Sequence, residues 1–247
     1  QYNQEDVDKS NMKTPTFMLT GNRFDSNNNF VLHARMESCI ITRIHNNNFV
    51  ANNERSKSGT AIIEAAPDEH SKQFEVEISN NLWANNKGTW CLYIMANNQN
   101  PFNGSVHGNK FERNENIRGS LIVGSSFFRI NGNEFNNHLE QFDLEVDFLQ
   151  NDSLDAANNY WGYEDDESIE KRVLDGRSDH SRGIAKIRPI NLKRAATIAD
   201  DCVAVSNCSM NGQCIGRNQC LCESGFAGED CSRISCLSLN NCSTNGY

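Results

Sequence analysis

A repeat of about 25 residues constrains the fold of this chain more than any other feature. Each copy has an aliphatic residue, an asparagine three positions later and an aromatic ring two positions after that, as in Leu19, Asn22 and Phe24. The last copy has only Ala156 at the aliphatic position. The asparagines are Asn22, Asn47, Asn81, Asn109, Asn133 and Asn159. The rings are Phe24, Phe49, Trp83, Phe111, Phe135 and Trp161, at intervals of 25, 34, 28, 24 and 26 residues. Such a period predicts a solenoid built from stacked units.

Short β-rich runs lie between these copies. Residues 74–78 and 144–148 alternate apolar and acidic side chains, which places one set inward and the other toward water. The path between neighbouring runs is too short for a crossover helix, so several strands per period indicate a coil of a parallel β-helix. We therefore predict an all-β fold, a parallel β-helix of about six coils over residues 1–163, with its continuation upstream left open.

The asparagine marks a corner of each coil. Asparagine tolerates the left-handed backbone that a tight corner requires, and asparagines stacked in successive coils can form a hydrogen-bonded ladder. The aliphatic and aromatic positions flank this bend, so both reach one core only if the chain turns between them. We expect a line of asparagines and, two residues later, a buried stack of rings.

Two other interpretations of the repeat are weaker. An asparagine-rich tract of low complexity would account for the 29 asparagines among the first 161 residues, but not for six phased copies. Leucine-rich repeats have a similar period, but their leucine pattern is missing here.

The segment after Trp161 is expected to close the solenoid, because an open last coil would expose strand edges and core. Asp165 or Asp166 would cap a short helix that runs through Ile169, Arg172 and Val173 to a turn at residues 175–176. Residues 184–190 would then return as an extended edge strand, which gives a cap and linker over residues 164–199. A calcium site at residues 164–167 is the less favoured alternative, because acidic residues also suit the start of a helix.

The ten cysteines indicate an oxidising compartment. Eight of them fall between Cys202 and Cys242, a density typical of small disulfide-stapled domains of secreted or surface proteins. Six cysteines, Cys202 to Cys231, allow fifteen pairings, and their spacing alone does not choose among them. Cys39 and Cys91 do not share a position in the repeat, so we expect buried thiols at both.

The six cysteines and the Gly-Phe-x-Gly-x-x-Cys ending at Cys231 resemble an EGF-like module over residues 200–233. The resemblance implies three disulfides: Cys202–Cys214, Cys208–Cys220 and Cys222–Cys231. About 30 residues cannot build a sufficient apolar core, so these bonds would hold the module together. Residues 234–247 repeat the opening of such a module, so Cys236 and Cys242 are expected to pair beyond this fragment.

A second resemblance concerns the solenoid and its end. The Asn-Tyr-Trp-Gly at residues 159–162, the Arg-Val-Leu-Asp-Gly-Arg at 172–177 and the Ile-Arg-Pro at 187–189 are similar to segments of very large animal surface proteins. That family contains right-handed parallel β-helix repeats and EGF-like modules, and includes a protein of insect tricellular junctions. The resemblance implies a right-handed β-helix and a role in extracellular adhesion or junction scaffolding.

Composition limits the partners and the location. The formal net charge is -9 and no basic run occurs, which argues against nucleic-acid binding. No apolar run reaches the roughly 18 residues of a membrane span, and the first residues lack a signal-peptide core, as in a mature or excised segment. Four glycosylation sequons, at Asn103, Asn151, Asn207 and Asn241, agree with secretion or surface display. The expected partners are other extracellular or cell-surface proteins, including a second copy of this chain, with glycan contact as a further expectation.

The sequence predicts a non-enzymatic protein with no cofactor and no metal. The candidate carboxylates are predicted to be solvated strand faces that lie apart: Glu75, Glu77, Asp143, Glu145 and Asp147. His45 and His107 occupy one repeat position, but Ser79 holds it in the coil between them, so a histidine metal site is not expected. The alternative function is a glycan-binding or polysaccharide-cleaving β-helix. The rings of Phe49, Trp83 and Trp161 would stack on sugars in such a protein if their register faced outward.

Overall fold

The chain folds into two compact units, residues 1–195 and 196–247. The computed structural model describes residues 16–37, 41–53, 58–67, 74–96, 102–149, 152–163, 165–192, 208–209, 211–214, 220–222 and 226–234.

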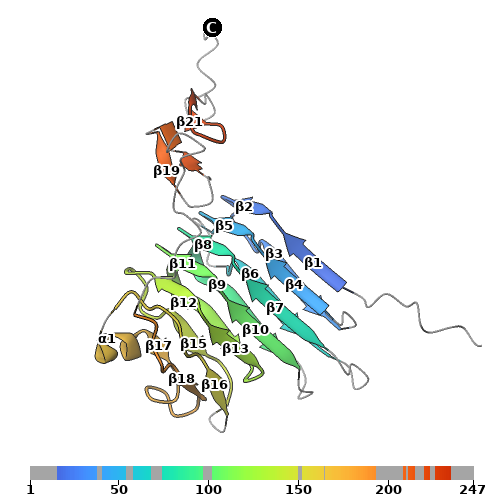
Figure 1. The fold of residues 1–247 in the computed structure, drawn as a ribbon, viewed down its shortest axis with the longest axis vertical. Coiled ribbons are helices and arrows are strands. Elements are labelled where there is room, and N and C mark those ends of the chain that lie inside the picture. The colour runs from blue at the N-terminus through green and yellow to red at the C-terminus, as the bar shows by residue number, and fades with distance from the viewer. Residues whose placement is uncertain are drawn as a thin grey trace, which may run out of the picture. The chain divides into compact units, whose positions relative to one another are not determined.

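The first unit consists of three parallel sheets whose strands come from successive turns of the chain (Figure 1). Sheet A contains β1 (Thr16–Thr20), β4 (Ile41–His45), β7 (Glu75–Ser79), β10 (Asn103–His107), β13 (Phe128–Asn131), β16 (Ser153–Asp155) and β18 (Ile184–Lys186). Sheet B contains β2 (Arg23–Asp25), β5 (Asn48–Val50), β8 (Leu82–Ala84), β11 (Lys110–Glu112) and β14 (Glu134–Asn136). Sheet C contains β3 (Leu32–Met36), β6 (Ala61–Ala65), β9 (Lys87–Ala96), β12 (Glu115–Gly124), β15 (Leu144–Val146) and β17 (Val173–Leu174).

The chain visits sheets A, B and C in turn, and this confirms the predicted parallel β-helix. Five coils have all three strands, from β1–β3 to β13–β15. In the sixth, the sheet B strand is reduced to one bridge between Glu134 and Tyr160. The prediction of about six coils is therefore met by five complete coils and one incomplete coil.

The core lies between the three sheets. Alternate residues of each strand point inward, so the strictly alternating β7 buries Val76 and Ile78 and leaves Glu75 and Glu77 partly exposed. Neighbouring coils place like residues at like positions: Ile44 pairs with Ile78, and Ile78 with Val106. The result is one continuous apolar cluster through the coils.

The C-terminal end of the solenoid differs from the expected cap in one respect. Helix α1 (Asp166–Lys171) has Asp165 as its N-cap, one of the two candidates predicted, and the Asp165 carboxylate accepts a hydrogen bond from the Ser168 backbone N–H. The helix stops before Val173, although the sequence predicted that it would include this residue. Val173 instead pairs with Leu144 and joins the core, because the open edge of sheet C offers both backbone partners and apolar contact.

The remaining cap residues also extend the solenoid. Strand β18 pairs in parallel with β16 at the edge of sheet A, so residues assigned to a cap supply a strand to this sheet as well as to sheet C.

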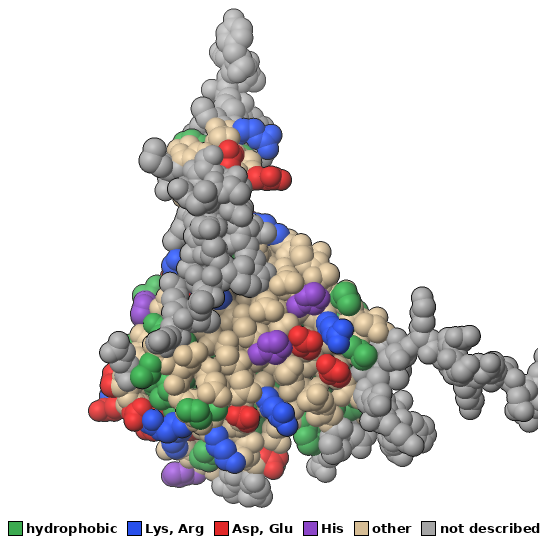
Figure 2. All heavy atoms as spheres, viewed as in Figure 1, with side chains coloured by type: hydrophobic (Ala, Val, Ile, Leu, Met, Phe, Trp, Pro, Cys, Tyr) green, Lys and Arg blue, Asp and Glu red, His purple; other side chains and the backbone are tan. Residues whose placement is uncertain are grey.

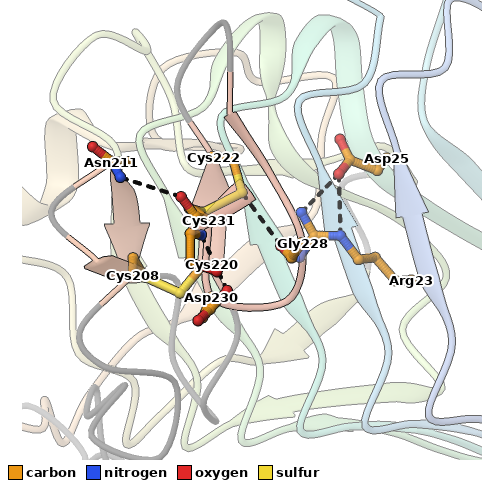
Figure 3. Close-up of a disulfide and its surroundings, with 10 residues drawn as sticks. Arg23, Asp25, Cys208, Asn211, Cys220, Cys222, Gly228, Asp230 and Cys231 are labelled. Carbon is orange, nitrogen blue, oxygen red and sulfur yellow. Dashed lines mark hydrogen bonds and ion pairs between the residues drawn. A yellow bond between two sulfur atoms is a disulfide. The ribbon is translucent and has the colours of Figure 1, made fainter. Parts of the chain in front are cut away.

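The second unit contains two short antiparallel hairpins. β19 (Gly212–Cys214) pairs with β20 (Cys220–Cys222), and β21 (Phe226–Ala227) pairs with β22 (Arg233–Ile234). Disulfides join Cys208 to Cys220 and Cys222 to Cys231 (Figure 3). These are two of the three bonds implied by the EGF-like resemblance, and the unit is consistent with such a module. The Cys202–Cys214 pair, Cys236 and Cys242 lie outside the part of the chain whose side chains are described.

Candidate functional site

An asparagine ladder runs along the corner between sheets A and B. The Nδ2 of each asparagine donates to the Oδ1 of the next: 3.1 Å from Asn22 to Asn47 and from Asn47 to Asn81, 2.9 Å from Asn81 to Asn109, 3.0 Å from Asn109 to Asn133 and 3.1 Å from Asn133 to Asn159. The structure thus brings all six predicted residues together in one line.

Each interior member of this ladder has its amide fully used. The Oδ1 of Asn81 accepts from both the backbone N and the Nδ2 of Asn47, and its own Nδ2 donates to Asn109 and to the carbonyl of Ile44. Asn81 is 2% exposed, so each of these bonds replaces water that the residue has lost. The corner is therefore a fully satisfied buried polar column.

The six predicted rings form a stack two residues beyond this ladder. Ring centroids are 4.8 Å apart for Phe24 and Phe49, 4.0 Å for Phe49 and Trp83, 5.9 Å for Trp83 and Phe111, 5.1 Å for Phe111 and Phe135, and 4.8 Å for Phe135 and Trp161. The last five rings are at most 1% exposed, and only Phe24, in the first coil, is half-buried. The rings of Phe49, Trp83 and Trp161 are therefore too deeply buried to stack on a sugar, and they cannot serve in glycan recognition.

A second asparagine ladder, which the sequence analysis missed, runs along the corner between sheets B and C. Its members are Asn27, Asn52, Asn86, Asn114 and Asn137, linked by Nδ2–Oδ1 hydrogen bonds of 3.0, 3.0, 3.1 and 3.0 Å. The signal was present in the sequence: a second asparagine follows the first by five residues in four copies, and by four residues in the fifth.

The second ladder ends on a buried ion pair. Asn137 donates to the Oδ1 of Asp143 at 2.9 Å, and Arg172 donates to the Oδ2 of Asp143 at 2.8 Å. Arg172 also binds the carbonyls of Asn137 and Glu140. Asp143 is 1% exposed, so its assignment to a solvated strand face was wrong: Arg172, 29 residues later in the chain, covers and neutralises it.

A buried carboxyl lies beside this ladder end. Glu140 Oε1 accepts from the backbone N and the Nδ2 of Asn116, at 3.1 and 2.6 Å, while Oε2 has no hydrogen-bond partner in the described part of the chain. Burial, and then the nearby Asp143, raises the pKa of Glu140 from 4.5 to about 8.

Asn116 also donates to the sulfur of Cys91 at 3.1 Å. Cys91 is a free buried thiol, as predicted, and burial raises its pKa well above the usual value. Cys39 lies outside the described residues.

A cluster of charges covers the outer face of sheet C. Both Arg118 and Arg182 bind Glu145, and both lie within 3.5 Å of Asp147. The hydroxyl of Tyr93 donates to Asp147 at 2.7 Å, and its pKa is raised by burial and by this carboxylate. Glu145 was predicted to be solvated but is 1% exposed, because the two arginines lie over it. The cluster joins β9, β12 and β15 to the segment before β18.

The outer face of sheet A carries the most exposed charged side chains in register. One row runs across the coils through Arg43, Glu77, Ser105, Arg129, Asp155 and Lys186. Figure 2 shows acidic, basic and histidine side chains gathered on the face of the solenoid unit. We call this row and the adjacent His45, Ser79 and His107 the sheet A face.

Contacts on the sheet A face are loose. Arg43 and His107 each lie 3.3 Å from Glu77, whose side chain is 25% exposed, and Ser79 donates to Glu77 at 2.9 Å. His45, Ser79 and His107 share one register position, as predicted. Arg129, Asp155 and Lys186 are exposed. This arrangement suits the binding of a charged surface better than it suits proton transfer, because the carboxylates of sheets A and C do not converge on one point.

The sequons fall mostly outside the described residues. Asn103 is exposed at the start of β10, whereas Asn151, Asn207 and Asn241 are not described. No group of three or more histidine, cysteine or acidic residues in the described ranges is placed to hold a metal ion. Within the same ranges, no helix has the length and apolar character needed to cross a membrane.

Comparisons of this chain with protein-family models, with curated proteins and with solved structures gave no match.

Proposed function

We propose that this chain is a non-enzymatic adhesion or scaffold segment of a cell-surface or extracellular-matrix protein. The observation that carries the proposal is the pair of asparagine ladders with the ring stack, which together form a continuous spine through the coils. Such a spine holds successive coils in fixed register, so that side chains on the sheet A face keep fixed spacings over seven strands.

The second unit supports an extracellular location. Disulfides such as Cys208–Cys220 persist in oxidising compartments, where secreted and cell-surface proteins fold. We propose other extracellular or cell-surface proteins as partners, and the sheet A face as the surface that meets them.

Bead aggregation and cell binding test this function. Beads coated with the full chain are expected to bind one another, or to bind cultured epithelial cells, more than beads coated with albumin. Reversal of two exposed charges by Arg129→Glu with Lys186→Glu should reduce this binding at least about tenfold, because reversed charges on a complementary surface slow association and repel the partner.

A control variant reverses one basic charge elsewhere. Lys171→Glu lies on α1, where the lysine side chain is 71% exposed, and should leave binding unchanged. Absence of any bead or cell binding would contradict the adhesion proposal. Equal loss in both variants would show that the sheet A face is not the surface involved.

Secretion provides a separate test of location. When the chain is expressed with a secretion signal in eukaryotic cells, we expect a glycan on Asn103, because this side chain is exposed and begins an Asn-Gly-Ser sequon. Enzymatic release of glycans followed by peptide mass spectrometry would detect it, with Asn103→Gln as the control. An unmodified Asn103 in secreted protein would contradict this expectation.

The glycan-binding or polysaccharide-cleaving function stays a second prediction. A panel of acidic and neutral polysaccharides, assayed for binding and for new reducing ends, would test it.

A further inference from the structure

The two ends of the solenoid differ in how far their core and ladder residues are buried. At the C-terminal end, Asn159 and Trp161 are 0% and 1% exposed, and β17 and β18 continue the sheets beyond them. At the N-terminal end, Phe24 is only half-buried and Asn22 is exposed. Most inward-facing residues of β1 and β3 are likewise only half-buried, namely Phe17, Leu19, Leu32 and Ala34, whereas Met36 at the end of β3 is buried. The first coil thus leaves apolar core and ladder ends in contact with water.

Hydrogen bonds in both ladders have one direction. At every step, the earlier coil donates its backbone N–H and its Nδ2–H to the Oδ1 of the later coil, as from Asn81 to Asn109. The later coil returns one bond, from its Nδ2 to a carbonyl of the earlier coil, as from Asn81 to Ile44. Asn137 is the exception, because its Nδ2 donates to Ser120 and Asp143. Each Oδ1 therefore depends on donors from the coil before it.

The first coil lacks these donors. Within the described residues, no group donates to the Oδ1 of Asn22 or of Asn27, and the second Nδ2 hydrogen of Asn22 bonds to Thr20 in its own coil instead of to an earlier one. The ring of Phe24 stacks on Phe49 with one face, and no ring of the described residues stacks on its other face. The exposed edge therefore presents two acceptors and one ring face, and it is formed by β1, β2 and β3, the end strands of sheets A, B and C.

We infer that this edge receives one further parallel β-coil, joined ahead of β1, in which an Asn-x-aromatic-x-x-Asn segment lies over Asn22, Phe24 and Asn27. Its two asparagines supply the missing donors, its ring continues the stack, and its strands pair with β1, β2 and β3. The closest ladder neighbours are 23 residues apart in sequence, so the occupant is a coil of at least this length.

A second copy of this chain does not satisfy the edge. Two such edges brought together would set Oδ1 against Oδ1 and would run their strands in opposite directions. The other end of a second copy is closed by β17, β18 and Arg172.

A grafted coil tests the inference in the full chain. Residues 102–126, which contain β10, β11 and β12, are placed directly before Thr16 in exchange for residues 1–15, which preserves the 24-residue ladder spacing seen from Asn109 to Asn133. The melting temperature of the solenoid should rise by about 5 °C or more, since each kcal/mol shifts a domain of this size by about 2–4 °C. Asn22→Leu should lower the melting temperature several times more in the grafted chain than in the parent.

Two controls decide between occupants. A graft carrying Asn109→Leu and Asn114→Leu in the copied coil should give a much smaller gain, because it keeps the ring, the strands and the backbone N–H donors but lacks both Nδ2 donors. An equal gain from that graft, or no gain from the intact one, would overturn the inference. Deletion of residues 1–15 from the parent should leave the melting temperature and the exchange protection of the Asn22 amide unchanged; a loss of both would identify those residues as the occupant instead.

Discussion

Trp83→Ala is expected to lower the free energy of unfolding of the solenoid by about 3–5 kcal/mol. The indole is 1% exposed and is stacked between Phe49 and Phe111, with centroids 4.0 and 5.9 Å away. These neighbours are held by their own coils through the two ladders, so the cavity left by the indole cannot close by collapse. Urea unfolding followed by circular dichroism would measure the change.

Two substitutions calibrate this result. Trp83→Phe should cost much less, because it keeps a ring in the stack and removes an indole N–H that has no hydrogen-bond partner in the described part of the structure. Phe24→Ala should also cost less, since this ring is half-buried at the end of the stack. A cost for Trp83→Ala no larger than that for Phe24→Ala would refute the buried stack.

Glu140→Gln is expected to stabilise the protein above neutral pH and to flatten its stability profile. The pKa of Glu140 is about 8 in the folded protein, against an ordinary 4.5. Between these values the unfolded chain has lost the proton that the folded protein keeps. Folded-state stability therefore falls as pH rises through this window, by up to about 1.4 kcal/mol per pH unit.

Over the whole window this loss amounts to about 3–5 kcal/mol, so the glutamine variant should exceed the parent by that margin near pH 8.5 and match it more closely at pH 5. Urea midpoints at pH 5, 7 and 8.5 would measure it. Glu115→Gln, on an exposed side chain at the start of β12, serves as control. If the parent and the Glu140 variant show parallel profiles, Glu140 is ionised in the folded protein and its burial has no pH cost.

The corner between sheets A and B could be predicted from the sequence because its chemistry is local. An aliphatic residue, an asparagine and a ring within six positions define an inward–bend–inward path, and Ile78, Asn81 and Trp83 follow it. The second corner carries another asparagine four or five residues later. In a sequence with so many asparagines, this position stands out only when the copies are aligned on the first corner.

The sequence could not show which outward residues are covered. Glu145 alternates with Leu144 and Val146 as a solvated residue would, but Arg118 and Arg182 lie over it from positions 27 and 37 residues away. Asp143 is covered in the same way by Arg172. Alternation within a strand reports which side of the sheet a residue takes. It does not show whether side chains from a distant segment, such as these arginines, cover the residue on that side.

The spacing of the ladders has a consequence for how this protein can vary. Sequence separations between ladder neighbours range from 23 to 34 residues, yet the Nδ2–Oδ1 distances stay between 2.9 and 3.1 Å. Residues added between β5 and β7 lengthen the chain without moving either asparagine ladder. Loop length and loop sequence can therefore change during evolution while the ladders and the ring stack keep the coils folded. Foreign recognition loops could be grafted into the loops of successive coils. The distance between such loops would then be fixed by the rise from one coil to the next.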